Sequence, residues 1–151
     1  MNIEREILER WIGTLADSHS QMSASLLAPK PDPFRNPVGY AIRTSMGELW
    51  KQLKGDMDPQ AVDSALDVVL RIRAVQDLSA TEAVGFVVRL RPILRQLSAT
   101  SEFASFDERI DQLALAAFDK YVQCRDQLRA ARLHEIGRLT HPHRSRGRVG
   151  V

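Results

Sequence analysis

The sequence predicts an all-α protein, a globin-like or irregular bundle of five or six helices with a long C-terminal helix. Apolar residues recur every three or four positions along most of the chain, and no segment alternates with the period of a strand. Helix-start patterns, either Asn or Asp before Pro or a Ser-x-x-Glu box, precede several of these stretches. The length of 151 residues fits one domain with its own core. We expect a helical domain over residues 1–137 and a disordered basic tail over residues 138–151.

The N-terminal apolar stripe predicts a first helix from about Ile3 to Leu27. The prolines that follow exclude helix and predict an extended crossing: Pro29, Pro31 and Pro33. Asn36-Pro37 then supplies an amide N-cap and a proline at the first helical position. This pattern predicts a second helix, which should end at Gly55.

Asp58-Pro59 repeats this start pattern and predicts a third helix, whose apolar stripe runs from Val62 to Val75. Ser79-Ala-Thr-Glu82 has the form of a capping box, so a fourth helix should begin there and run towards Ala99. Pro92 lies inside this fourth helix. It should kink the helix or split it in two, because proline cannot complete the helical hydrogen bonds.

The last helix is predicted from apolar residues that share one face: Phe106, Ile110, Leu113, Ala117, Tyr121, Cys124 and Leu128. Their spacing averages about 3.67 residues per turn, which is typical of a long and nearly straight helix. A capping-box pattern at Ser105–Glu108 precedes this stripe, and Gly137 followed by Pro142 should end the helix.

The net charge of +2 conceals an asymmetry between the body and the tail. Residues 138–151 hold four arginines and no acid, so residues 1–137 carry a net charge of −2. The acidic body argues against nucleic-acid binding, and the tail has no interleaved aromatic residues that would favour it. The charged N-terminus is unlike a signal peptide, and the apolar runs are too short to span a bilayer. We therefore expect a cytoplasmic protein without a membrane span.

The residues that could carry enzymatic or cofactor chemistry favour structural roles instead. No Gly-rich phosphate loop or nucleophile elbow occurs. The acids Asp63/Asp67 and Asp107/Glu108/Asp111 alternate with core stripes, so we expect them on solvated helix faces. Cys124 falls on an apolar stripe and should be a buried, inert thiol. The predicted fourth helix contains no histidine that could bind a haem iron. Taken together, these features lead us to expect a non-enzymatic protein without a cofactor or metal.

Polar residues gather at the end of the predicted third helix, where they need partners: Arg71, Arg73, Gln76 and Asp77. Helix geometry should place one of the two arginines outward and the other against the core. In a structural role, the cluster would cap the third helix and tie it to Asp111, Asp119 or the turn at 32–36. In a functional role, it would bind a protein partner or a ligand.

Several segments within residues 5–136 are similar in sequence pattern to one protein family: Asp32–Gly39, Ala65–Asp77, Ser79–Phe86, Arg109–Asp119 and Tyr121–Arg125. Together they resemble the N-terminal sensory domain of RsbR-type stressosome proteins, which antagonise the RsbT kinase (the RsbRD N-terminal family). The resemblance implies a haem-free, globin-like fold that dimerises and receives or transmits signals. Full-length members continue into a sulfate-transporter/anti-sigma-antagonist domain, whereas this sequence is expected to be a stand-alone member with only a short tail.

The last helix also carries more apolar residues than one face can bury, which favours packing against a second chain. We therefore expect a non-enzymatic signalling or regulatory module that forms a homodimer and binds an unidentified protein partner. The candidates for the dimer interface are Trp11, Phe103, Phe118, Tyr121, Leu128 and Leu133. Two alternatives remain open. One is a small-molecule sensor with a pocket between the third, fourth and last helices, and the other is a nucleic-acid-binding regulator that uses the basic tail.

Overall fold

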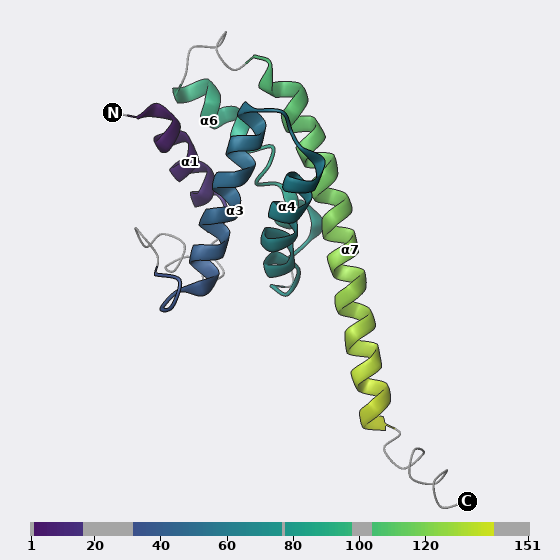
Figure 1. Cartoon of the computed structure of the whole chain (residues 1–151). Helices are drawn as coiled ribbons and strands as arrows, with labels where there is room; N and C mark the ends of the chain where they lie inside the picture. Colours follow the sequence, from purple (N-terminus) through teal and green to yellow (C-terminus); the bar gives the residue numbers. More distant parts are fainter. Residues whose placement is uncertain (1, 17–31, 77, 98–103, 141–151) are drawn as a thin grey trace, which may run out of the picture.

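The computed structural model describes residues 2–16, 32–76, 78–97 and 104–140, and within these ranges it contains six helices and no strand. The helices are α1 (Ile3–Gly13), α3 (Pro37–Lys54), α4 (Pro59–Ala74), α5 (Ala80–Val84), α6 (Leu90–Leu97) and α7 (Phe106–Thr140). In Figure 1 the shorter helices lie on one side of α7, whose C-terminal part extends beyond them. The predicted all-α class and the long last helix are confirmed. No helix within the described ranges is both long and apolar enough to cross a membrane.

The second and third predicted helices begin where their caps indicate. The Asn36 side chain accepts a hydrogen bond from the Gly39 amide at 3.0 Å, and Asp58 accepts one from the Ala61 amide at 3.1 Å. In both helices proline occupies the first helical position, where its missing N–H costs no hydrogen bond. Gly55 follows the last residue of α3, as expected.

The first helix is shorter than predicted, because α1 ends at Gly13 and not near Leu27. Its last turn tightens: the amides of Thr14 and Leu15 bond carbonyls three residues back, at 3.0 Å each. The Thr14 hydroxyl also donates to the Trp11 carbonyl at 2.6 Å. This turn directs Leu15 into the core, where it is 3% exposed. The rest of the predicted helix, and the crossing prolines before Asp32, lie outside the described residues.

The fourth predicted helix is split into α5 and α6, as Pro92 suggested. Both hydrogen bonds of the capping box are present, each 3.1 Å long, between Ser79 and Glu82. The break lies upstream of Pro92, which sits in the first turn of α6. Proline has no N–H to offer the Val88 carbonyl, which instead accepts from the Arg91 amide at 3.2 Å. The chain between the two helices also turns Phe86 fully into the core.

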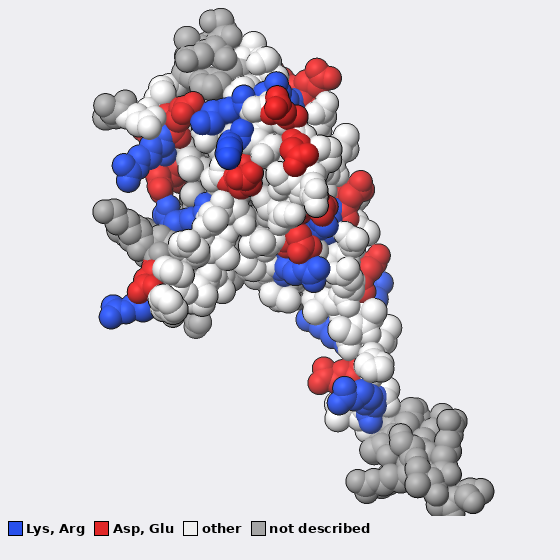
Figure 2. Space-filling model, in the orientation of Figure 1, with Lys and Arg blue, Asp and Glu red and all other residues white. Residues whose placement is uncertain are grey.

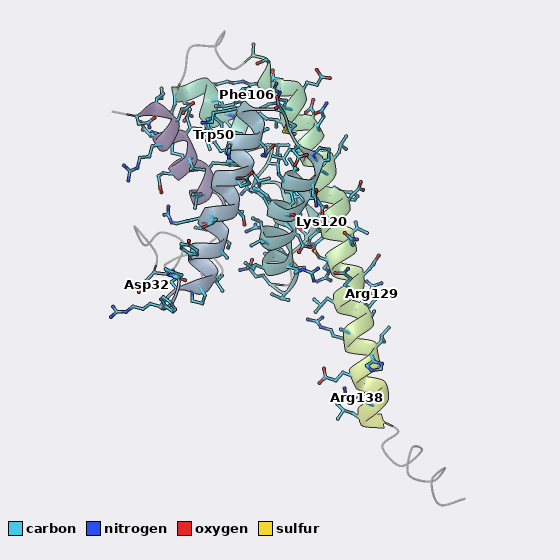
Figure 3. All side chains as sticks on the ribbon, viewed as in Figure 1. Asp32, Trp50, Phe106, Lys120, Arg129 and Arg138 are labelled. Carbon is cyan, nitrogen blue, oxygen red and sulfur yellow. The ribbon has the colours of Figure 1, made fainter. Side chains whose placement is uncertain are left out.

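The apolar face predicted for the last helix is the face that meets the body. Its residues from Phe106 to Cys124 are buried and Leu128 is half-buried. Figure 3 shows Phe106 beside Trp50 of α3, and their rings meet edge to face with centroids 5.7 Å apart. The predicted end at Gly137 is wrong, because α7 continues to Thr140. Gly137 does not adopt the left-handed conformation that would end a helix.

Candidate functional site

Arg73 is buried and joins three separate parts of the chain. Its side chain extends from the last turn of α4, and the residue is 3% exposed. The guanidinium donates to the carbonyls of Ala83 (2.9 Å), Glu82 (2.7 Å) and Leu15 (3.2 Å). These bonds connect α4 to α5 and to the turn after α1. Arg73 is thus the inward arginine of the predicted pair, and these three bonds go to carbonyls and not to Asp111, Asp119 or the 32–36 turn.

Arg71 points the other way, so the two arginines of the predicted polar cluster do not meet at one site. The Arg71 side chain is 56% exposed, and its Nε lies 3.0 Å from Asp67, one turn earlier in α4. The hydrogen bond to Asp67 raises the pKa of Arg71 above its ordinary value. The backbone N–H of Gln76 donates to the Arg73 carbonyl at 3.2 Å in the turn after the helix. Asp77 lies outside the described residues.

A largely apolar groove of about 320 Å³ opens between the end of α4 and the middle of α7. Arg71 is the only charged residue among those that line it: Arg71, Ala74, Val75, Cys124, Gln127, Leu128 and Ala131. The neighbouring Arg125 donates to the Ala74 carbonyl at 3.2 Å, which satisfies one acceptor at the end of α4. The groove lies between two of the three helices named for a ligand pocket, those that correspond to α4 and α7.

Cys124 is buried at the base of the helix contact, as its position on the apolar stripe predicted. The residue is 4% exposed, and burial raises the pKa of the thiol above its ordinary value of 9.0. A protonated thiol is a poor nucleophile.

We expect iodoacetamide at neutral pH to modify folded Cys124 slowly and the urea-unfolded chain rapidly, as followed by mass spectrometry. Phe34→Cys in a Cys124→Ala background is the control, because Phe34 is 93% exposed and a thiol there should react quickly in the folded chain. Equal rates for the two folded proteins would contradict the burial.

Lys120 forms an ion-pair network between α7 and α4 that sequence reasoning missed. Its Nζ lies 2.8 Å from Asp63 and 3.8 Å from Asp67, and only 10% of its side chain is exposed. Figure 3 shows Lys120 on the part of α7 that runs beside α4. The two acids were expected to be solvated, and the Asp63 side chain is indeed 64% exposed. The sequence feature that could have indicated this network is the position of Lys120, which is next to Tyr121 of the buried stripe of α7.

The hydrogen bond to Asp63 raises the pKa of Lys120 above its ordinary 10.5. A raised folded-state pKa means that this contribution to stability is complete below pH 10.5. It is then lost as the pH rises through the folded-state pKa. We expect the free energy of unfolding to fall more steeply above pH 10.5 in the parent chain than in Lys120→Met. Urea titrations should be made in a Cys124→Ala background, which removes the thiol titration. Parallel pH profiles would contradict a stabilising role for the ammonium.

Two of the acids at the start of α7, Asp107 and Asp111, are also paired, although they remain exposed. Arg91 of α6 lies 3.2 Å from Asp107 and also binds Asp111. Hydrogen bonds to these acids raise the pKa of Arg91, with Asp111 the larger cause. Arg109 donates to the Leu53 carbonyl at the end of α3 at 2.6 Å. These contacts fasten the start of α7 to α6 and α3. Within the described ranges, no group of three or more His, Cys, Asp or Glu side chains is arranged to hold a metal.

The residues predicted for a dimer interface divide into buried and exposed sets. Trp11 and Tyr121 are buried in the chain's own core, so the prediction is wrong for both. The Trp11 indole donates to the Phe86 carbonyl and the Tyr121 hydroxyl to the Leu78 carbonyl, each at 2.7 Å. An apolar stripe in a sequence does not reveal whether the residues that pack against it belong to the same chain or to another.

The remaining interface candidates lie on α7 or outside the described structure. Phe118 and Leu133 are 48% and 63% exposed, and Leu128 is half-buried beside the groove. Phe103 lies outside the described residues. The exposed members extend along the free side of α7, where Figure 2 shows uncharged surface between the charged side chains.

The described fold is an all-helical domain whose charged clusters fasten its own helices and whose last helix projects from the body. The chain matches the family described as RsbT co-antagonist protein rsbRD N-terminal domain over residues 5–136, and it therefore belongs to that family. This match confirms the family inferred from the sequence segments. Neither a curated protein nor a solved structure matched the chain.

Proposed function

We propose that this chain is a non-enzymatic regulatory module of the stressosome type that acts by binding other proteins. The observation that carries the proposal is the family match over residues 5–136, in a family named for co-antagonists of RsbT. The polar clusters give further support, because Arg73, Lys120 and Arg91 bind groups within the chain. Their chemistry is used to hold the helices together, and the exposed apolar residues of α7 are available for partners.

The proposed partner is an RsbT-type kinase or a co-antagonist of the same cell. Isothermal titration of the purified chain against each candidate tests this directly. We expect saturable binding to at least one, and weaker binding by Val75→Glu, which changes a residue that is 59% exposed beside Arg71 and outside the proposed α7 contact. The control is Phe34→Glu, which changes a residue that is 93% exposed in the turn before α3. If the parent chain bound neither an RsbT-type kinase nor a co-antagonist, the result would contradict the proposed stressosome role.

The module also self-associates through the free side of α7 in this proposal. Leu115, Phe118 and Val122 are 71%, 48% and 43% exposed there, and a contact between two chains would remove them from water. Light scattering coupled to gel filtration should give the mass of a dimer. Phe118→Glu should give a monomer with unchanged helical circular dichroism, whereas Phe34→Glu should stay dimeric. A parent chain that remains monomeric at the highest soluble concentration would refute self-association.

The groove beside Arg71 supports a second candidate function, the sensing of a small apolar carboxylate. A volume of about 320 Å³ lies at the small end of ligand pockets. Its apolar walls suit an alkyl chain, and the Arg71 guanidinium suits a carboxylate. We expect octanoate to raise the melting temperature of the parent chain and octanol to raise it less. Arg71→Gln should abolish the difference between the two ligands, and equal effects in the parent chain would exclude carboxylate recognition.

A further inference from the structure

The free side of α7 carries its exposed apolar residues in two groups separated by a charged stretch. The first group is Leu115, Phe118 and Val122, and the second is Leu133, Ile136 and Leu139, which are 63%, 58% and 74% exposed. Steps of three and four residues keep each group on one side of the helix. Asp126 and Arg129 lie between the groups on the same side, and both are exposed. A partner that covers the whole stripe must therefore accommodate apolar, charged and again apolar surface.

The second group needs cover more than the first does. Every residue from Arg129 to Leu139 is exposed, and Figure 3 shows Arg138 on the part of α7 beyond the body. Most helical stability in proteins comes from packing of an apolar face, and this exposed segment packs little of its own. Contact with another helix would stabilise it.

We propose that a second copy of this chain covers the stripe, with the two α7 helices antiparallel and centred near residues 125–126. This proposal rests on the self-association proposed above and adds its orientation. Leu115 and Phe118 of each chain then lie opposite Ile136 and Leu133 of the other. The first group of one copy covers the second group of its partner, so the projecting end of each α7 packs beside the other chain's body-supported half.

The charges of α7 favour this direction over a parallel one. Residues 106–120 hold four acids and two bases, whereas residues 121–140 hold four bases and two acids. With Arg91 of α6 counted, the first half remains negative by one charge, and the second is positive by two. An antiparallel pair brings opposite halves together. In a parallel pair like halves meet, and Arg129 faces its own copy, which is destabilising.

Arg129 also has specific acids within reach in the antiparallel pair. With the centre near residues 125–126, it lies within about one helical turn of Asp119 and Asp126 of the other chain. Both acids are exposed. The arginine stem can cover the neighbouring apolar residues while its guanidinium reaches a carboxylate at the edge. The charged stretch between the apolar groups thus gains partners in this arrangement.

Cysteine cross-linking in a Cys124→Ala background tests the orientation. The variants are Phe118→Cys, Leu133→Cys and the chain with both changes, each treated with a short bis-maleimide reagent. We expect a dominant dimer band for the double variant and near loss of that band for either single variant. The two cysteines of one chain cannot meet, since about 22 Å of helix separates them. Asp126→Cys, near the centre, should cross-link in either orientation and reports whether the reagent can act.

The possible outcomes separate the orientation from self-association itself. Efficient cross-linking of either single variant would show a parallel pair and overturn the antiparallel arrangement while self-association stands. Absence of all dimer bands, including that of Asp126→Cys, together with a monomeric mass would refute both. A dimeric mass without cross-links at any of the three positions would place the contact elsewhere and overturn this interface. Arg129→Glu should weaken the antiparallel dimer several-fold, and a tighter dimer would contradict the charge argument.

Discussion

Replacing Arg73 by alanine is expected to lower the free energy of unfolding by about 3 kcal/mol, because it removes a buried donor group from several acceptors. The carbonyls of Leu15, Glu82 and Ala83 would lose their hydrogen bonds to the guanidinium. Two of these acceptors lie in α5, and the third belongs to the turn after α1. The change should therefore loosen both the N-terminal helix and the junction after α4. Urea unfolding followed by circular dichroism measures the loss.

Arg71→Ala is the matched control for this prediction. It removes the same side chain two residues earlier in the same helix, but this guanidinium is exposed and makes an ion pair within one turn. Such surface pairs contribute little to stability, so we expect little measurable change. Arg73→Lys should lie between the two, since an ammonium cannot reproduce the planar fork. Equal unfolding midpoints for Arg73→Ala and Arg71→Ala would contradict the structural role of Arg73.

Replacing Trp11 by alanine is expected to cost about 3–5 kcal/mol of unfolding free energy, the range for large aromatic residues removed from a core. Trp11 is completely buried, and its ring centroid lies 6.2 Å from that of Phe86. Its indole also donates to the Phe86 carbonyl at 2.7 Å, which holds the segment between α5 and α6. The side chain thus links α1 to a part of the chain without regular helix. Thermal and urea unfolding both measure the expected loss.

Trp11→Phe separates the two contributions of this residue. It retains an aromatic ring and removes the donor, so we expect a smaller loss of about 1–3 kcal/mol from the unpaired carbonyl. Phe34→Ala is the control, because that ring is 93% exposed and contributes no comparable burial. If Trp11→Ala and Phe34→Ala had similar stability, Trp11 would not belong to the core. If Trp11→Phe matched the parent chain, the hydrogen bond would have no net effect.

Local sequence signals predicted helix starts well because each start depends on neighbouring residues. Asn36, Asp58 and Ser79 cap helices through bonds to amides only three residues away. Helix ends were harder to predict. The end of α1 at Gly13 depends on where Leu15 is buried, and α7 passes through Gly137. The first depends on packing against residues that are distant in sequence, which a local pattern does not contain. At Gly137 the helix simply continues in open surroundings, because glycine permits the left-handed conformation but does not require it.

The same distinction applies to the candidate site. The sequence indicated that Arg71 and Arg73 face different ways, because helical spacing alone requires it. It did not indicate that Arg73 binds the Leu15 carbonyl, 58 residues away along the chain, or the carbonyls of Glu82 and Ala83 in the next helix. Lys120 was likewise missed, since its partner Asp63 lies on another helix. Spacing within one helix cannot reveal a contact that forms only when two helices meet.

The sequence by itself determined the helical class, the capped helix starts, the buried face of the last helix and the family. These properties follow from local hydrogen bonding and from a 3.6-residue period, both of which are written in neighbouring residues. The tertiary structure decided which apolar residues are buried in the core of the chain, such as Trp11 and Tyr121, and which remain exposed, such as Phe118 and Leu133. Burial depends on the approach of segments that are distant in sequence, and that approach is settled only when the helices pack.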